Sequence, residues 1–290
     1  MKQVLQAFAV AAVVLAAACS QSPKSENTIA ARQSAALEAN RKGEAYVRHG
    51  ELENAARSYR EALRLSQSLE DADGIAANAV NLSIVRQRQG RFADARASLN
   101  AVLEQPNLRF PPARLAEAAL RQALIDLDER RFASADGWVS QAANYCGERC
   151  PLSGAIHNVR AQLSLQSDRL DGAAASARAA LAASRSAGDR AEVANALRLL
   201  GIGALRAGDA AAARSQLEQA LAIDRELGAP RKIALDLLAL GRAAELGGDR
   251  EAARGYYARA LSVSEADRDN TGVAEARAAL SAVDKAATGK

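Results

Sequence analysis

The chain has 290 residues, of which 49% are apolar but only 3% aromatic, and 38 Lys and Arg against 34 Asp and Glu give a formal charge of +4. Because the basic residues are spread along the chain and form no run, the sequence argues against a nucleic-acid partner. An interior with so few aromatic residues must be built mainly from Ala and Leu, which favour helices and let them approach closely. We therefore expect closely packed helix pairs and not a sheet.

The N-terminus has the features of an export signal. Lys2 precedes an apolar stretch over residues 4–18, which is too short for a comfortable membrane span. The stretch ends in three Ala before Cys19, and this ending resembles the lipobox of bacterial lipoproteins, in which the Cys is acylated and becomes the mature N-terminus. Residues 1–18 are thus expected to be a lipoprotein signal peptide, and the resemblance implies that Cys19 is lipidated. Cleavage after Ala18 by an ordinary signal peptidase is the alternative.

Residues 19–30 are expected to contain the lipidated Cys and a flexible tether. Ser20 follows Cys19 where an Asp would be the inner-membrane retention signal of lipoproteins, so the resemblance implies an outer-membrane anchor that faces the periplasm. Residues 21–28 are polar and include Ser, Pro, Lys and Asn, as in mobile linkers. A cytoplasmic protein with an uncleaved, signal-like anchor is the alternative, and palmitate labelling would distinguish the two.

Residues 31–287 repeat with a period of about 40 residues. The first copy has a small residue, Gly43, then a turn glycine, Gly50, and then Ala55, Tyr59 and Ala62. The small residue recurs in five further copies, as Ser83, Ala123, Ala161, Gly201 and Gly241. These places are 40, 40, 38, 40 and 40 residues apart, so six copies fill almost all of the chain after the tether.

This pattern is similar to the tetratricopeptide consensus, with a period longer than the usual 34 residues. It resembles the long-helix subclass found in kinesin light chain and in many bacterial regulators. The resemblance implies an all-α, right-handed α-solenoid of about six helix-turn-helix repeats, in which small residues let helices A and B of each repeat cross closely. Residues 270–287 have apolar residues at helical spacing and are expected to be a C-terminal capping helix.

Cys146 and Cys150 lie between the third and fourth repeats, where the repeat spacing falls to 38 residues. In an oxidising periplasm, a disulfide that closes this short loop is the leading hypothesis. A metal site that adds His157 and a pair of free thiols are the alternatives.

No catalytic constellation is visible in the sequence. The two His, His49 and His157, lie far apart in the array, and the chain has no Gly-rich phosphate loop, nucleophile elbow or HExxH motif. We therefore expect a protein that is not an enzyme and binds no cofactor, metal or small-molecule substrate.

The inner face of helix A in successive repeats is the expected binding surface. We number each repeat so that its small residue, such as Gly201, is place eight. Places two, five, nine and twelve then share one helix face, and this face is mostly apolar. The predicted groove residues are Asn81, Ile84, Leu120, Leu124, Leu127, Asn158, Arg198, Ile202, Leu205, Leu238 and Arg242. Asn81 is included because the long-repeat subclass often has an Asn there that bonds a bound peptide's backbone. Part of this apolar area must be ordinary packing between repeats, and the remainder would accept an apolar segment with some acidic character.

The sequence as a whole predicts a membrane-anchored periplasmic scaffold or assembly factor that binds another envelope protein. Its architecture resembles that of lipoproteins with tetratricopeptide repeats, including the pilotins that help secretin rings reach the outer membrane. An adaptor that brings a periplasmic protease or a peptidoglycan hydrolase to its substrate is an alternative. An enzyme with an unrecognised site is an alternative from another class.

Overall fold

The computed structural model describes residues 28–105, 107–147 and 150–288, and these contain thirteen α-helices and no strand. The helices are α1 Ile29–Arg48, α2 Leu52–Gln67, α3 Ala72–Arg88, α4 Phe92–Leu103, α5 Pro112–Asp128, α6 Phe132–Cys146, α7 Ser153–Gln166, α8 Leu170–Ala187, α9 Arg190–Arg206, α10 Ala210–Glu226, α11 Pro230–Leu246, α12 Arg250–Ala266 and α13 Asn270–Thr288. Consecutive helices pair from α1 and α2 to α11 and α12, and α13 packs on the last pair. The expected all-α solenoid of six repeats with a capping helix is confirmed.

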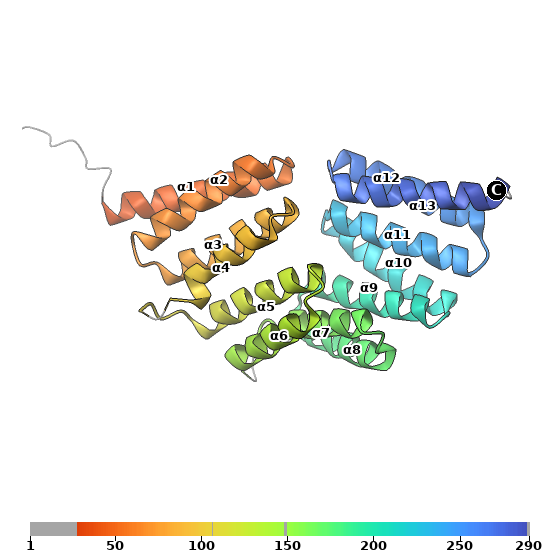
Figure 1. The fold of residues 1–290 in the computed structure, drawn as a ribbon, viewed down its shortest axis with the longest axis horizontal. Helices are drawn as coiled ribbons and strands as arrows, with labels where there is room; N and C mark the ends of the chain where they lie inside the picture. The colour runs from red at the N-terminus through yellow and green to blue at the C-terminus, as the bar shows by residue number, and fades with distance from the viewer. Residues whose placement is uncertain (1–27, 106, 148–149, 289–290) are drawn as a thin grey trace, which may run out of the picture.

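The stack of helix pairs curves back on itself. In Figure 1, α1 to α4 form one arm, α9 to α13 form the other arm, and α5 to α8 connect the two arms below. We call these the N-terminal arm and the C-terminal arm. Helix A of each repeat, which is the odd-numbered helix, packs against helix A of the next repeat, so that these helices form a continuous inner layer.

The small residues of the repeat lie where helices A and B cross. A Cβ atom added to Gly43 would lie 2.7 Å from Cε1 of Tyr59, and one added to Gly201 would lie 2.6 Å from Cγ of Leu217. Tyr59 and Leu217 are both buried, so the aromatic ring or the Leu fills the space that the missing side chain leaves. This is the close helix approach expected from the sequence.

The turns within and between repeats combine a left-handed residue with a helix cap. Gly208 ends helix A of the fifth repeat with φ +82°, a conformation that costs other residues steric energy. The side chain of Asp209 then accepts a hydrogen bond of 2.9 Å from the backbone N–H of Ala212 and so caps α10. The same pairing of residues, Gly248 with Asp249, joins α11 to α12.

The third repeat is joined to its neighbours by longer loops. Eight residues separate Leu103 of α4 from Pro112 of α5, and six separate Cys146 of α6 from Ser153 of α7. Phe110, in the first loop, is 9% exposed and packs into the core of the N-terminal arm. In the part of the chain that is described, no helix is long and apolar enough to cross a bilayer.

Candidate functional site

A cavity of about 840 Å³ lies on the inner face of the solenoid. It is lined by the odd-numbered helices α5, α7, α9, α11 and α13, and we call it the inner groove. Of the residues predicted from the repeat register, the lining includes Leu120, Leu124, Asn158, Arg198, Ile202, Leu238 and Arg242. The helical register thus brings together side chains that are more than 120 residues apart in the sequence.

The apolar part of the inner groove has a buried floor and an accessible wall. Leu120 and Leu238 are 7% and 3% exposed and therefore belong to the core. Leu124 and Ile202 are half-buried, and Leu235 is 43% exposed. Because the apolar surface that these three side chains still expose to water would gain free energy from being covered, this wall is the part of the groove that can gain from a partner.

A buried ionic cluster supports the floor of the inner groove. Nε of Arg198 on α9 donates a 2.6 Å hydrogen bond to Asp236 on α11, and Nη2 donates to Asp224 on α10. The side chains of Arg198, Asp224 and Asp236 are only 8%, 4% and 0% exposed. Burial raises the pKa of Asp236 to about 6, although the charge of Arg198 and its hydrogen bond act in the opposite direction. The charge of Arg198 is therefore already neutralised within the fold.

Polar side chains at one end of the inner groove also hold the repeats together. Asn158 on α7 donates a 2.7 Å hydrogen bond to the Glu192 carboxylate and a 3.0 Å bond to its backbone carbonyl. Nζ of Lys232 on α11 donates to Oδ1 of Asn195 at 3.0 Å. Burial and the nearby charge of Arg198 lower the pKa of Lys232. Asn158 thus connects the fourth repeat to the fifth, and Lys232 connects the sixth to the fifth.

Four of the predicted groove residues lie outside this lining. Leu127 is 5% exposed in the core of the third and fourth repeats, and Leu205 packs against the core of the C-terminal arm. Both lie in the last turn of helix A, where the side chains turn toward neighbouring helices. Ile84 packs against the core of the N-terminal arm, and Asn81 is half-buried on α3.

Other lining residues were missed by the sequence reasoning although the register contained a signal for them. Glu192 and Lys232 lie three residues before place two of their repeats, which puts them one turn earlier on the same helix face. Glu275 is 40 residues after Leu235, so α13 contributes to the groove as a seventh helix A would. The groove lining therefore begins one helical turn earlier on α9 and α11 than the sequence predicted, and it also includes the capping helix α13.

The two Cys between the third and fourth repeats are bonded to each other. A disulfide joins Cys146, the last residue of α6, to Cys150, and their Cα atoms are 5.0 Å apart. Neither thiol is then available to a metal ion, and the described residues contain no group of three His, Cys, Asp or Glu that could hold one. Burial lowers the pKa of the nearby His157. Cys19 and the predicted signal peptide lie outside the described residues.

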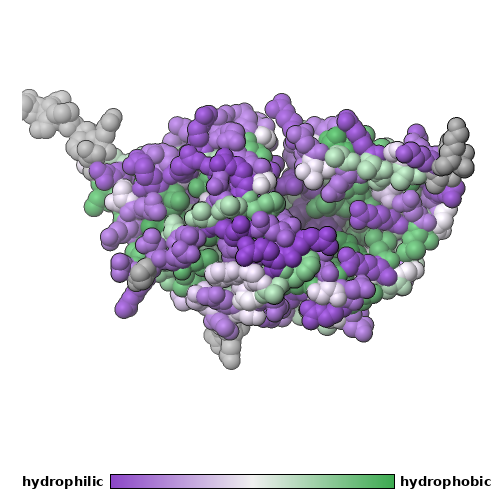
Figure 2. Space-filling view, in the orientation of Figure 1, coloured by the Kyte–Doolittle hydropathy of each residue, from purple (hydrophilic) through white to green (hydrophobic). Residues whose placement is uncertain are grey.

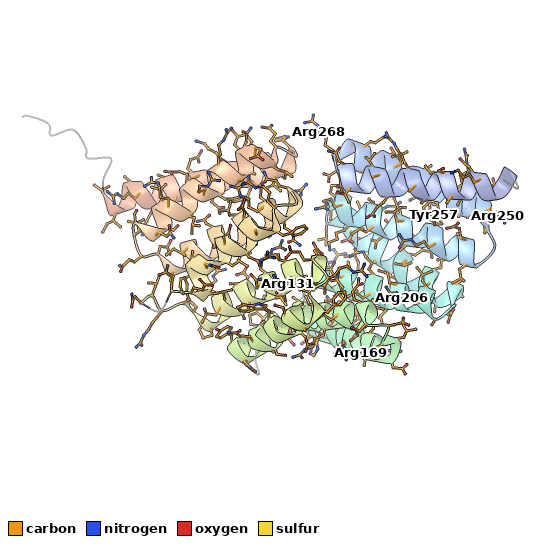
Figure 3. All side chains as sticks on the ribbon, viewed as in Figure 1. Arg131, Arg169, Arg206, Arg250, Tyr257 and Arg268 are labelled. Carbon is orange, nitrogen blue, oxygen red and sulfur yellow. A yellow bond between two sulfur atoms is a disulfide. The ribbon has the colours of Figure 1, made fainter. Side chains whose placement is uncertain are left out.

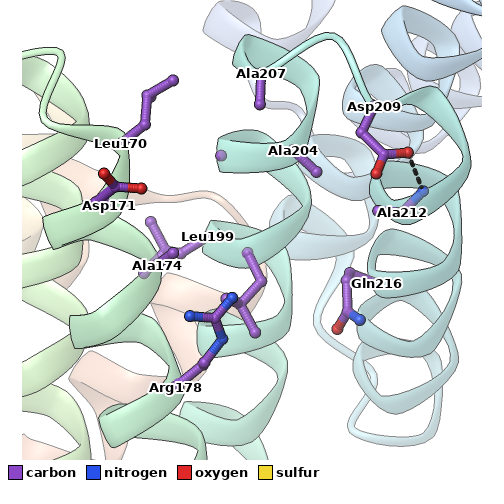
Figure 4. A pocket seen from close by; sticks show the side chains of 12 residues that line it. Leu170, Asp171, Ala174, Arg178, Leu199, Ala204, Ala207, Asp209, Ala212 and Gln216 are labelled. Carbon is purple, nitrogen blue, oxygen red and sulfur yellow. Dashed lines mark hydrogen bonds between the residues drawn. The ribbon is translucent and has the colours of Figure 1, made fainter.

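A second, smaller cavity of about 340 Å³ lies between α8, α9 and α10. Figure 4 shows that Arg178 projects into it from α8 and that the facing side is formed by Ala204 on α9 and Ala207 just after the end of that helix. Small residues on α9 leave this space open. None of the predicted groove residues lines this cavity.

Comparison with known proteins identifies the fold. No family model and no curated protein sequence matches the chain. Among solved structures, a Rap protein complexed with competence and sporulation factor superimposes with a TM-score of 0.62 at 14% identity, over 87% of this chain and 71% of that one. The fold is a tetratricopeptide-like solenoid.

Two further structures share this tetratricopeptide-like fold. A signal-transduction ATPase with a tetratricopeptide-repeat sensor from Pyrococcus horikoshii gives a TM-score of 0.59 at 15% identity, over 88% of this chain and 40% of that one. BtubC (BKLC) from P. vanneervenii gives a TM-score of 0.53 at 22% identity, over 81% of this chain and 92% of that one. At these identities the likeness concerns the fold alone, so function must be argued from the site.

Proposed function

We propose that this protein is an interaction scaffold whose inner groove binds a short, largely apolar segment of a partner protein. The observation that carries the proposal is the cavity of about 840 Å³ between five helices of the inner layer. Leu124, Ile202 and Leu235 offer apolar surface there that the chain itself leaves uncovered. Burying roughly 300 Å² of apolar surface, counted on the groove and on the bound segment together, would supply about 7 kcal/mol before ordering costs, enough for a moderate affinity.

The size of the inner groove limits its occupant. An α-helix with its side chains is roughly 10–12 Å across and rises 1.5 Å per residue, so a cavity of this volume holds roughly six residues of a helix. A folded domain does not fit such a space, whereas the end or the exposed loop of a partner does. Arg242 lines the groove, is exposed and has no ion-pair partner among the described residues, so it can pair with an acidic residue of the segment.

Binding fits the chemistry of the inner groove better than catalysis. Several of its ionisable groups are engaged in contacts between repeats: Arg198 with two carboxylates, Glu192 with Asn158, and Lys232 with Asn195. A general acid, base or nucleophile must be free to meet a substrate. These side chains instead connect neighbouring repeats and line or support the groove.

We also propose that the scaffold is held at the periplasmic face of the outer membrane by a lipid on Cys19. The support for this location is the run of small residues before Cys19 and the Ser that follows it. Each buried CH₂ group of an acyl chain contributes roughly 0.8 kcal/mol, so a multiply acylated Cys anchors a protein stably. The described fold begins at Ile29, a short distance along the chain from this residue.

The groove is tested by Leu235→Glu with Leu227→Glu as its matched control. Both Leu are 43% exposed, but Leu235 lines the inner groove and Leu227 lies at the end of α10, outside that lining. The two variants, each tagged and crosslinked in envelopes, would be compared by quantitative mass spectrometry of the recovered proteins. We expect Leu235→Glu to lose a specific set of partners by tenfold or more, and Leu227→Glu to keep them. Equal recovery by two variants with unchanged thermal midpoints would place the partner on another surface.

A further inference from the structure

The two arms of the solenoid touch at their ends. Gly50, in the turn between α1 and α2, has Arg268 and Asp267 beside it, in the turn between α12 and α13. An ideal Cβ on Gly50 would lie 3.6 Å from Cβ of Arg268 and 3.8 Å from the backbone oxygen of Asp267. These are van der Waals distances, so the two turns, at opposite ends of the six-repeat array, lie close enough for a side chain at position 50 to touch Arg268.

This contact is specific to the first turn of the array. Gly90, Gly208 and Gly248 occupy the same place in later repeats with φ between +73° and +82°, and an added Cβ would meet nothing within 4 Å at any of them. Gly50 has the same conformation, with φ +72°. The glycine turn is therefore a general feature of the repeat. Of these four glycines, only Gly50 has residues of the other arm, Asp267 and Arg268, beside it.

Opposite charges face each other beside this contact. Arg88, the last residue of α3, lies close enough to Asp267, Asp269 and Arg231 of the C-terminal arm for their charges to act on its pKa, although its guanidinium makes no direct ion pair with either carboxylate. Burial lowers the pKa of Arg88 and raises that of Asp267, as expected for charged groups enclosed between two surfaces. Nε of Arg231 also lies 3.1 Å from the Asp269 carboxylate. The cluster thus contains two cations and two anions, with one cation supplied by the N-terminal arm.

The figures show where the two arms approach each other. Arg268 lies at the top of the molecule, between the ends of the two arms (Figure 3). Hydrophilic side chains cover the place where the arms meet, and the surface below it is hollowed (Figure 2). In Figure 1, α5 to α8 connect the arms below, whereas at the top the ribbons of the two arms stay apart, so the arms approach each other only through residues at the ends of their helices.

We propose that Gly50 and Arg88 form an ionic clasp with Asp267, Arg268 and Asp269, which closes the solenoid into a ring. The clasp controls how a partner reaches the inner groove: a free chain end can thread the closed ring, but a loop between two folded domains enters only when the clasp opens. The geometry of the clasp stands without the proposed function, and only this consequence for entry rests on it.

The test uses a disulfide between the two turns in the purified full chain. Native disulfides have Cβ atoms about 3.5–4.5 Å apart, and the 3.6 Å between the Gly50 and Arg268 positions falls in this range. Gly50→Cys with Arg268→Cys should crosslink in a glutathione redox buffer, as shown by peptide mapping. Gly90→Cys with Arg268→Cys is the matched control, because Gly90 has the same backbone conformation and no neighbour, and it should stay uncrosslinked.

The ionic character of the clasp is tested in the same crosslinking assay. Arg88→Gln should slow the formation of the 50–268 disulfide by roughly two- to fivefold, as for the loss of a partly buried charge pairing. Raising the salt to 1 M, where charges are screened within about 3 Å, should slow it similarly. Arg64→Gln is the control, since Arg64 pairs with Glu61 on α2 and faces no residue of the clasp.

Each outcome bears on the clasp and not on the groove. Failure of the 50–268 pair to crosslink, or equal crosslinking of the 90–268 pair, would overturn the closed ring. Crosslinking at a rate that is unchanged by salt and by Arg88→Gln would overturn its ionic nature. The partner recovery of Leu235→Glu is measured separately, so a failed clasp leaves the proposed groove standing and a failed groove leaves the clasp standing.

Discussion

Replacing Gly201 by Ala tests whether the small residue of the repeat is required by packing, and Gly203→Ala on the same helix is its control. In a helix interior, Ala is more favourable than Gly by roughly 0.5–1 kcal/mol, and both variants receive this gain. A Cβ at position 203 would meet only Cδ2 of Leu165, at 3.9 Å, which is ordinary contact. Gly203→Ala should therefore raise the free energy of unfolding by about the helix gain.

At position 201 the new Cβ would lie 2.6 Å from Cγ of Leu217 and 3.2 Å from the backbone oxygen of Ala213. Leu217 is 0% exposed and cannot move away without displacing its neighbours. Overpacking of this kind costs roughly 1–3 kcal/mol, which exceeds the helix gain. Gly201→Ala should thus be less stable than Gly203→Ala by about that cost.

Thermal unfolding followed by circular dichroism measures the difference. In a chain of this size, 1 kcal/mol corresponds to roughly 2–4 °C in Tm, so the two variants should differ by several degrees in the stated order. Urea titration of the same proteins provides an independent measurement. If Gly201→Ala proves as stable as Gly203→Ala, the close approach of α9 and α10 does not limit this position, and the packing argument for the repeat consensus fails.

Three further predictions concern the buried ions and the cysteines. The pKa of Asp236 is raised from 3.8 to about 6 in the fold, so the folded chain binds more protons between these values and loses stability as the pH rises through them. Asp236→Asn should remove this loss, so the free energy of unfolding from urea titrations should change between pH 4.5 and pH 7 by roughly 1–3 kcal/mol less than in the native chain; an unchanged profile would mean that Asp236 does not titrate there. Cys146 and Cys150 should resist alkylation until a reductant is added, and full modification without reduction would show free thiols. Cys19→Ala should abolish palmitate labelling and release the protein from membranes, so labelling that persists in the variant would disprove lipidation at this residue.

The helices, their pairing and the number of repeats could be read from the sequence because they depend on local patterns. Gly43, Gly201 and Gly241 mark helix crossings, since each leaves room for a specific large side chain 16 residues later. Helical periodicity also identified much of the inner layer, because residues on one face of helix A remain neighbours when the repeats stack. The cap was found for the same reason, and its register even carries Glu275 into the groove.

The use of individual side chains within that layer could not be inferred from the register. Arg198 was expected to offer its charge to a partner, but Asp224 and Asp236 from two other helices neutralise it. Leu127 and Leu205 share their helix face with groove residues, yet the neighbouring helices cover them. Periodicity predicts which face of a helix a side chain lies on, whereas the neighbouring helices determine whether that side chain is exposed or buried.

The sequence by itself determined the repeat, the helix pairs and the face that each helix A turns inward. Only the tertiary structure decided that the arms meet, so that Gly50 lies beside Arg268 and Arg88 lies near Asp267. The physical reason is that the path of a solenoid is the sum of small rotations between successive repeats. A local pattern specifies each step well, but closure depends on the accumulated path over all six repeats.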